Sequence, residues 1–186
     1  PELAPFVDDL RASLRDLEDE YRRMQGPEVD WNGERLRMLL HTQLRGDQVI
    51  VVSNREPYIH EQGADGIVVK RPASGLVTAV EPVMRACSGT WIAHGSGSAD
   101  REVVDASDRV GVPPGHEDYQ LRRIWLTPEE EQGYYYGFAN EGMWPLCHVA
   151  HVRPVFRESD WEAYKRVNQR FADAVVAEAR SEDPVV

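Results

Sequence analysis

The 186-residue chain has few cysteines, no long apolar run and a shortage of positive charge. Two cysteines, Cys87 and Cys147, are too few for a disulfide-framed secreted module. No apolar stretch approaches the roughly 20 residues that a membrane span requires. Lys and Arg number 21 against 32 Asp and Glu, a formal net charge of −11. The acidic balance predicts no nucleic-acid partner, because attraction to phosphate depends on Lys and Arg, and the lack of a long apolar run predicts no membrane partner. Any bound anion would need a local group of arginines.

The apolar content of 41 % and the length favour one domain with a hydrophobic core over a disordered chain. The chain opens with Pro1-Glu2-Leu3, which is acidic where a secretory leader is basic. Together with two unpaired cysteines, this predicts a cytoplasmic location.

Residues 1–46 form a predicted helical extension. Apolar residues recur at alternating steps of four and three, a heptad pattern: Leu3, Val7, Leu10, Leu14, Leu17, Tyr21 and Met24. A second helix is predicted from about Glu34 to Arg45, with Gly46 as its stop. The two helices could form an antiparallel hairpin on the domain, or the first could form a coiled coil that makes a homo-oligomer. The hairpin is favoured because the heptad run is short.

Residues 47–186 alternate strand and helix patterns, which predicts an α/β sheet. The apolar run Gln48–Asn54 suits a strand buried on both faces. Further strands are predicted at Gly66–Lys70, Thr90–Ala93 and Gln120–Leu126, and Val185-Val186 looks like the beginning of another buried strand.

Three helix starts are marked in the sequence. Ser74 is a candidate cap for a helix to about Cys87, which Pro82 should kink or restart. Thr127-Pro128-Glu129-Glu130 and Ser159-Asp160-Trp161-Glu162 both have the pattern of a capping box. The second box opens a predicted helix whose buried stripe comprises Trp161, Tyr164, Asn168, Phe171 and Val175.

Two groups of residues could bind a ligand. The first strand delivers Asn54 and Arg55 to the carboxyl edge of the sheet, and Arg71–Leu76 is a glycine-bearing helix start, so an arginine clamp for phosphate is plausible there. Taken alone, the pattern is explained better by an ordinary turn with a surface arginine. Tyr134–Phe138 and Trp144 offer aromatic faces for a sugar ring, although Phe138 suits the core and three successive tyrosines on a helix cannot all be buried.

No cofactor or metal is predicted. Cys147, His148 and His151 lie close together, but no further ligand follows at matching spacing, so packing is the favoured interpretation. Gly95-Ser96-Gly97-Ser98 lacks the third glycine of a dinucleotide fingerprint.

The order of several motifs resembles the amino-terminal part of the trehalose-6-phosphate synthases, glycosyltransferase family 20, over about Asp47–Val186. The motifs are Val51–Arg55, Ser74–Ala79, a strand bearing Trp91, Tyr134–Asn140, Met143–His148, Trp161–Tyr164, Val167-Asn168 and Phe171–Asp173. The resemblance implies a Rossmann-like amino-terminal half of a two-domain GT-B enzyme, here incomplete. It implies transfer of glucose, with retention, from a nucleotide-glucose donor to glucose 6-phosphate.

Carried over by position, Arg55 and Tyr135 are expected at the acceptor phosphate. Trp144 is expected beside the acceptor sugar, and Trp91 in the same pocket. Gly75 is expected in a mobile loop near the donor phosphates, where Ser74 stands in place of a usual second glycine.

The family's next Asp-Tyr-His segment and its nucleotide-binding domain have no counterpart here, so we expect no transfer by this chain alone. Two alternatives stay open: glycerol 3-phosphate as the acceptor, as in glucosylglycerol-phosphate synthases, and a non-catalytic module that binds sugar phosphate or drives assembly.

Overall fold

A four-stranded sheet forms the centre of the computed structural model, which describes residues 32–43, 48–148, 152–180 and 184–186. The strand order is β1-β4-β6-β5. Strands β1 (Ile50–Arg55), β4 (Thr90–His94) and β6 (Tyr119–Ile124) are parallel, and β5 (Arg109–Val112) is antiparallel to β6. The strands expected at β1, β4 and β6 are confirmed, whereas no pattern in the sequence indicated β5.

Helices α3 (Gly75–Cys87) and α7 (Glu158–Glu178) cover opposite faces of this sheet. Trp91 packs with Met84 of α3 in one core cluster, and Ile92 packs with Phe171 of α7 in the other. Side chains alternate between the two faces along a strand, so neighbours on β4 serve different cores. The α/β architecture expected from the sequence is confirmed.

Strand β1 is less buried than its apolar run predicted. It lies at the edge of the sheet, and Val52 is 38 % exposed, whereas every residue of β4 is buried. Val185 makes an isolated parallel bridge to Val49 on the outer side of β1. Val185 and Val186 are exposed, and the place of Val185 beside β1 is strand-like, as the sequence indicated.

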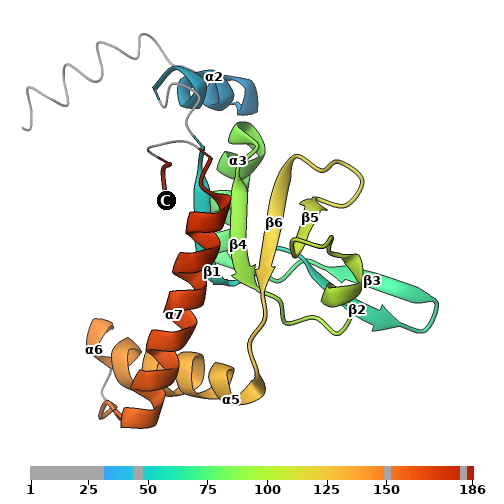
Figure 1. Ribbon diagram of the computed structural model, residues 1–186. Coiled ribbons are helices and arrows are strands. Elements are labelled where there is room, and N and C mark those ends of the chain that lie inside the picture. Colours follow the sequence, from blue (N-terminus) through green and yellow to red (C-terminus); the bar gives the residue numbers. More distant parts are fainter. Residues whose placement is uncertain (1–31, 44–47, 149–151, 181–183) are drawn as a thin grey trace, which may run out of the picture.

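A second, two-stranded sheet projects from the body of the molecule (Figure 1). It pairs β2 (Ile59–Gly63) with β3 (Gly66–Lys70). The strand at Gly66–Lys70 was expected, but β2 and the short helix α4 (Asp100–Val103) were not.

The helix starts confirm one capping box and correct the other. Thr127 caps α5 (Pro128–Glu131) with the full capping box. Helix α7 is capped at Arg157, so Ser159 lies inside the first turn rather than before it. The buried stripe is therefore displaced from the predicted one and comprises Asp160, Ala163, Val167, Phe171, Ala174 and Glu178, while Trp161 is 43 % exposed.

Helix α3 confirms the expected helix from a cap at Ser74 to about Cys87. It runs without interruption through Pro82, so it does not restart there, and Ser74 occupies the cap position without a capping hydrogen bond from its side chain.

Between α5 and α7 the chain forms the π-helix η1 (Gln132–Met143) and the short helix α6 (Trp144–Cys147). Figure 1 shows α5, η1 and α6 gathered at the end of the sheet where β4 and β6 end. No helix of the described residues has the length and hydropathy needed to cross a bilayer.

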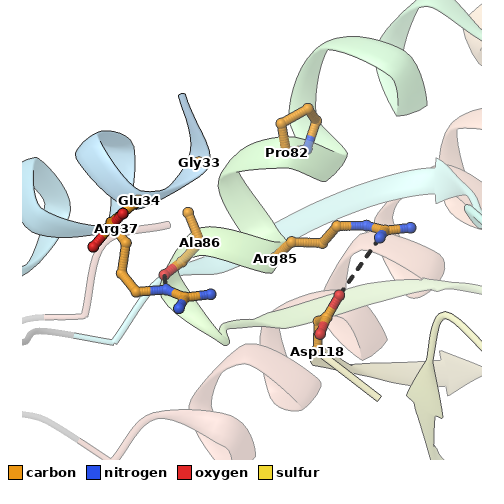
Figure 2. A pocket seen from close by; sticks show the side chains of 7 residues that line it. All are labelled: Gly33, Glu34, Arg37, Pro82, Arg85, Ala86 and Asp118. Carbon is orange, nitrogen blue, oxygen red and sulfur yellow. Dashed lines mark hydrogen bonds and ion pairs between the residues drawn. The ribbon is translucent and has the colours of Figure 1, made fainter. Parts of the chain in front are cut away.

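Helix α2 (Gly33–Gln43) lies at the other end of the sheet and confirms the second predicted helix of the extension. Its Arg37 donates from Nε to the Ala86 carbonyl of α3 at 3.3 Å. A cavity of about 540 Å³ lies here, in which Arg85 pairs with Asp118 (Figure 2). The heptad segment Leu3–Met24 lies outside the described residues, so the hairpin and the coiled coil both stay predictions.

Candidate functional site

Strand β1 ends in a β-bulge. Ser53 pairs with Ala93, but Arg55 pairs with His94, so Asn54 is the extra residue. A bulge bends the strand and redirects its side chains, and bulges are common next to functional sites. At this bulge the carboxyl ends of β1 and β4 meet, which is where open α/β sheets bind ligands.

A pocket of about 270 Å³ opens at the bulge, and we call it the bulge pocket. Its walls come from the ends of β1 and β4, from β2, from the loop before α3, and from α5 and η1. They comprise Asn54, Arg55, Glu56, Ile59, Pro72, His94, Ser96, Glu131, Tyr135 and Tyr136.

The rim of the bulge pocket carries a cation and a phenol. Arg55 is exposed, and its Nη2 donates to the Tyr135 hydroxyl at 3.4 Å. Tyr134, Tyr135 and Tyr136 point in different directions along η1, and Tyr136 is exposed, as expected for three successive tyrosines. An arginine with free N–H groups beside a phenol can hold a phosphate group through charge-assisted hydrogen bonds.

The floor of the pocket is polar and buried. His94 is only 6 % exposed, and burial lowers the pKa of its imidazole even though the Glu131 and Asp100 carboxylates oppose that shift. Asn54 Oδ1 is buried and has no hydrogen-bond partner among the described residues. The floor thus offers a neutral imidazole and a free acceptor, which suit ligand hydroxyl groups.

Behind the floor lies a buried charged group, which we call the Arg123 cluster: Glu56, His60, Asp100 and Arg123. The Arg123 guanidinium donates to Glu56 Oε2 at 2.7 Å, to Asp100 Oδ1 at 2.8 Å and to His60 Nδ1 at 2.8 Å. It also donates to the Tyr58 carbonyl at 3.1 Å. One arginine of β6 therefore holds side chains from the segment after β1, from β2 and from α4.

The protonation of this cluster follows from burial and hydrogen bonding. Burial, reinforced by the neighbouring Asp100 carboxylate, raises the pKa of Glu56 to about 7. Burial opposes ionisation of Asp100 too, but hydrogen bonds from Glu56 and from the His60 and Gly97 amides outweigh it and lower the Asp100 pKa. Burial and Arg123 lower the pKa of His60, which is consistent with a neutral ring that accepts from Arg123 at Nδ1. At neutral pH Glu56 is the group of the cluster that can exchange a proton.

The structure brings together two of the four residues expected around the acceptor. Arg55 and Tyr135 meet at the bulge pocket. Trp91 has no exposed surface and lies in the core under α3, and it does not line the bulge pocket. Its indole N–H donates to the Ser53 hydroxyl at 2.8 Å, and Ser53 donates to the Arg55 carbonyl at 2.7 Å, so Trp91 supports the bulge from behind.

Trp144 is not part of the bulge pocket either. It lies in α6, beyond the carboxyl end of η1, is 51 % exposed and stacks on His148 with ring centroids 4.0 Å apart. The described residues contain no group of three potential metal ligands. Because His151 lies outside the described residues, packing of Cys147, His148 and His151 stays a prediction.

The donor-loop candidates lie near the pocket without lining it. Pro72 of the same loop reaches the wall, while Ser74 and Gly75 stand at the start of α3. A Cβ atom at Gly75 would meet nothing within 4 Å, so no contact within the described chain requires glycine there.

Sequence reasoning missed several lining residues, chiefly Glu56, His94 and Ser96. The same rule that placed Arg55, that ligands bind where parallel strands end, would have pointed to His94 after the strand Thr90–Ala93. A second signal was Arg123, a charged residue inside an apolar strand, since a buried arginine requires partners.

Comparison with known proteins identifies the family. The sequence profile of glycosyltransferase family 20 matches residues 47–186. The chain therefore belongs to glycosyltransferase family 20, and the predicted family is confirmed.

The relatives in this family are trehalose-6-phosphate synthases. The chain is 37 % identical over 140 residues to the trehalose-6-phosphate synthase of Mycobacterium ulcerans, covering 74 % of this chain and 27 % of the relative. It is 38 % identical over 126 residues to that of Mycobacterium avium, covering 67 % and 25 %. The chain thus spans about a quarter of the length of these relatives.

Two solved structures share the fold. The trehalose-6-phosphate synthase OtsA superposes with a TM-score of 0.51 at 24 % identity, over 74 % of this chain and 28 % of that one. The enzyme from Burkholderia multivorans gives a TM-score of 0.50 at 26 % identity, over 75 % and 28 %. The predicted α/β fold class is therefore confirmed for a partial domain.

Proposed function

We propose that this chain is the acceptor-binding portion of a retaining glycosyltransferase that transfers glucose from a nucleotide-glucose donor to glucose 6-phosphate, giving trehalose 6-phosphate. One observation carries the proposal: Arg55 and Tyr135, 80 residues apart in sequence, meet at 3.4 Å on the rim of a pocket at the carboxyl edge of the parallel strands. Membership of glycosyltransferase family 20 narrows the chemistry to sugar transfer.

The division of the pocket into rim and floor suggests how the acceptor is oriented. The Arg55 guanidinium and the Tyr135 hydroxyl lie at the rim and would bind the phosphate group. The buried His94 and Asn54 Oδ1 at the floor would bind hydroxyl groups of the sugar ring. The phosphate would then stay near solvent while the ring enters the pocket.

The size of the pocket favours a small acceptor. Its volume of about 270 Å³ is close to the lower end, about 300 Å³, of the usual range for small-molecule sites. A single phosphorylated sugar suits this space better than a disaccharide or a nucleotide.

The donor is assigned to a different part of the enzyme. We propose that nucleotide-glucose contacts the loop at Ser74 and Gly75 and is otherwise held by the part of the relatives' length that this chain does not match. The 186-residue chain alone is expected to bind the acceptor without transferring glucose, and the reaction is expected in the cytoplasm. Incubating the chain with nucleotide-glucose and glucose 6-phosphate tests this, since formation of trehalose 6-phosphate would contradict it.

Calorimetric titration of the chain with glucose 6-phosphate tests the proposed function. We expect Arg55→Ala to weaken binding by about 1.5–3 kcal/mol, at least tenfold, because it removes a charge-assisted contact. Arg153→Ala, which removes an exposed arginine that does not line the pocket, is the matched control and should bind normally.

Glycerol 3-phosphate in the same titration distinguishes the two acceptors. Stronger binding of glucose 6-phosphate is expected, because the floor can hold more hydroxyl groups than glycerol offers. An unchanged affinity in Arg55→Ala would show that the bulge pocket is not the acceptor site.

A further inference from the structure

Glu56 joins the ends of three strands at the bulge pocket. It follows Arg55 directly and is only 1 % exposed. Its Oε1 accepts from the Ser96 amide at 2.9 Å and lies 3.1 Å from the Ser96 hydroxyl, in the loop after β4. Its Oε2 accepts from Arg123 Nε of β6 at 2.7 Å. One carboxyl group thus fixes both Arg55 and Ser96, two residues that line the pocket.

We propose that Glu56 is a positioning residue that couples anion binding to proton uptake: when an anion binds at Arg55, Glu56 takes a proton from solvent and turns the Ser96 hydroxyl toward the anion. This inference rests on the proposed function, because it requires an anionic ligand in the bulge pocket.

The charge balance of the Arg123 cluster supports the uptake of a proton. With Glu56 and Asp100 both ionised, one guanidinium faces two carboxylates, so a net negative charge lies behind the floor. An anion at the rim would raise the cost of that charge, and protonation of Glu56 removes it. The charged and titratable groups around Glu56 are Arg55 on β1, His60 on β2, His94 on β4, Asp100 on α4, Arg123 on β6 and Glu131 on α5.

Among these groups Glu56 is the one suited to titrate near neutrality. Arg55 and Arg123 keep their charge at any physiological pH. Hydrogen bonds favour the ionised form of Asp100, and burial favours the neutral forms of His60 and His94. The Glu56 pKa of about 7 leaves its carboxyl group close to half protonated at neutral pH.

Ser96 links this proton to the ligand. While Glu56 is ionised, the Ser96 hydroxyl donates to Oε1, so its hydrogen is unavailable to the pocket. Once Glu56 is protonated it donates to Asp100, and its neutral Oε1 is a weaker acceptor than a carboxylate oxygen, so the serine hydrogen is free to donate to an anion held by Arg55. No bond other than O–H and hydrogen bonds changes, and the proton comes from water.

Calorimetry in two buffers of different ionisation enthalpy measures the proton taken up on binding. The probe is glucose 6-sulfate, because its charge stays constant between about pH 6 and about pH 9. At about pH 7.5 we expect the wild-type chain to take up about half a proton per ligand bound, and its affinity to fall several-fold by about pH 8.5.

Glu56→Gln should mimic the protonated carboxyl group, since it is neutral at every pH and its amide can donate to Asp100 as the protonated carboxyl group does. We expect it to bind without proton uptake and with an affinity that is constant over this pH range. Glu158→Gln, an exposed residue at the start of α7, is the matched control and should keep the wild-type uptake. If Glu56→Gln does not fold, Ser96→Ala serves instead: it should keep most of the uptake, which arises from the charge of the Arg123 cluster, but bind the sulfate ester several-fold more weakly, and an unchanged affinity would overturn the role of Ser96.

The outcomes separate this inference from the proposed function. Binding of the sulfate ester by the wild type with no proton uptake would overturn the role of Glu56 and leave the acceptor pocket standing. Wild-type uptake that persists in Glu56→Gln would also overturn it. If neither glucose 6-sulfate nor glucose 6-phosphate binds the wild type, both proposals are wrong.

Discussion

Two adjacent arginines on β6, Arg122 and Arg123, form buried ion pairs on opposite sides of the sheet. Arg123 faces two carboxyl groups, Glu56 and Asp100, beside the bulge pocket. Arg122 shares one carboxylate, Glu178 near the end of α7, with Arg109 of β5, at N–O distances of 2.7 and 2.8 Å. We call this second set the Glu178 cluster.

The ratio of acids to bases sets the behaviour of each cluster. Burial opposes the ionisation of Glu178, but hydrogen bonds from Arg109 and Arg122 outweigh it and lower the Glu178 pKa. In the Arg123 cluster a single guanidinium serves two carboxyl groups, and the pKa of Glu56 rises. In the Glu178 cluster, two cations for one carboxylate therefore keep the ion pairs between α7 and the sheet charged. In the Arg123 cluster, two carboxyl groups for one cation allow one of them to bind a proton.

The largest expected effect is on folding stability. Arg123→Met should lower the free energy of unfolding by about 3–5 kcal/mol, because it leaves two buried carboxyl groups without their cation. Arg122→Met should cost only about 1–2 kcal/mol, since Glu178 keeps Arg109. Urea unfolding followed by tryptophan fluorescence measures both.

The loss in Arg123→Met should shrink in acid, where Glu56 can become neutral. Equal losses in the two variants would contradict the contrast between the clusters.

The pH dependence of stability should have opposite signs in the two clusters. Folding raises the Glu56 pKa from 4.5 to about 7, so its contribution is complete below pH 4.5 and is lost as pH rises through about 7. The loss amounts to on the order of 3 kcal/mol. Folding lowers the Glu178 pKa, so its contribution is present above pH 4.5 and is lost as pH falls through the folded value.

Urea midpoints of the wild type, Glu56→Gln and Glu178→Gln over a pH series check these signs. The stability difference between the wild type and Glu56→Gln should change most between about pH 4.5 and about pH 7. A difference that stays flat across this window would refute the titration of Glu56.

A smaller effect separates binding at the rim from stability. Tyr135→Phe removes the hydroxyl that meets Arg55 and should weaken glucose 6-phosphate binding by about 0.5–1.5 kcal/mol without changing the urea midpoint. Tyr134→Phe, on the same helix but outside the bulge pocket, is the control and should bind like the wild type. Equal weakening in both variants would indicate a general effect on η1.

The smallest effect is expected at Trp144. Trp144→Ala removes an exposed indole that does not line the bulge pocket, so glucose 6-phosphate affinity should change by less than about 0.5 kcal/mol. Titration of this variant beside Tyr135→Phe measures it. A loss larger than that of Tyr135→Phe would restore Trp144 to the acceptor site.

Local patterns predicted β1, β3, β4 and β6 but missed β2 and β5. The order of the motifs predicted the family, and the sequence also pointed to Arg55 and Tyr135. The end of an apolar run placed Arg55 at the sheet edge, and the capping box placed the start of α5. The burial of each strand was harder to predict than its position in the sequence. The apolar run of β1 does not reveal that this strand lies at the edge of the sheet.

Pocket residues that depend on the face of a strand were also missed. Trp91 and His94 both belong to β4, but Trp91 lies in the core under α3 while His94 lines the pocket. The buried partners of Arg123 come from three separate segments, and only the tertiary fold brings them together.

Chemical-shift mapping of the isotope-labelled chain during titration with glucose 6-phosphate shows whether the acceptor binds in the bulge pocket. We expect the amide signals of Asn54, Arg55, Ser96 and Tyr135 to shift with a common dissociation constant, and those of Arg37 and Arg85, at the larger cavity, to stay in place. Shifts confined to the cavity between α2 and α3, with the bulge unchanged, would contradict it.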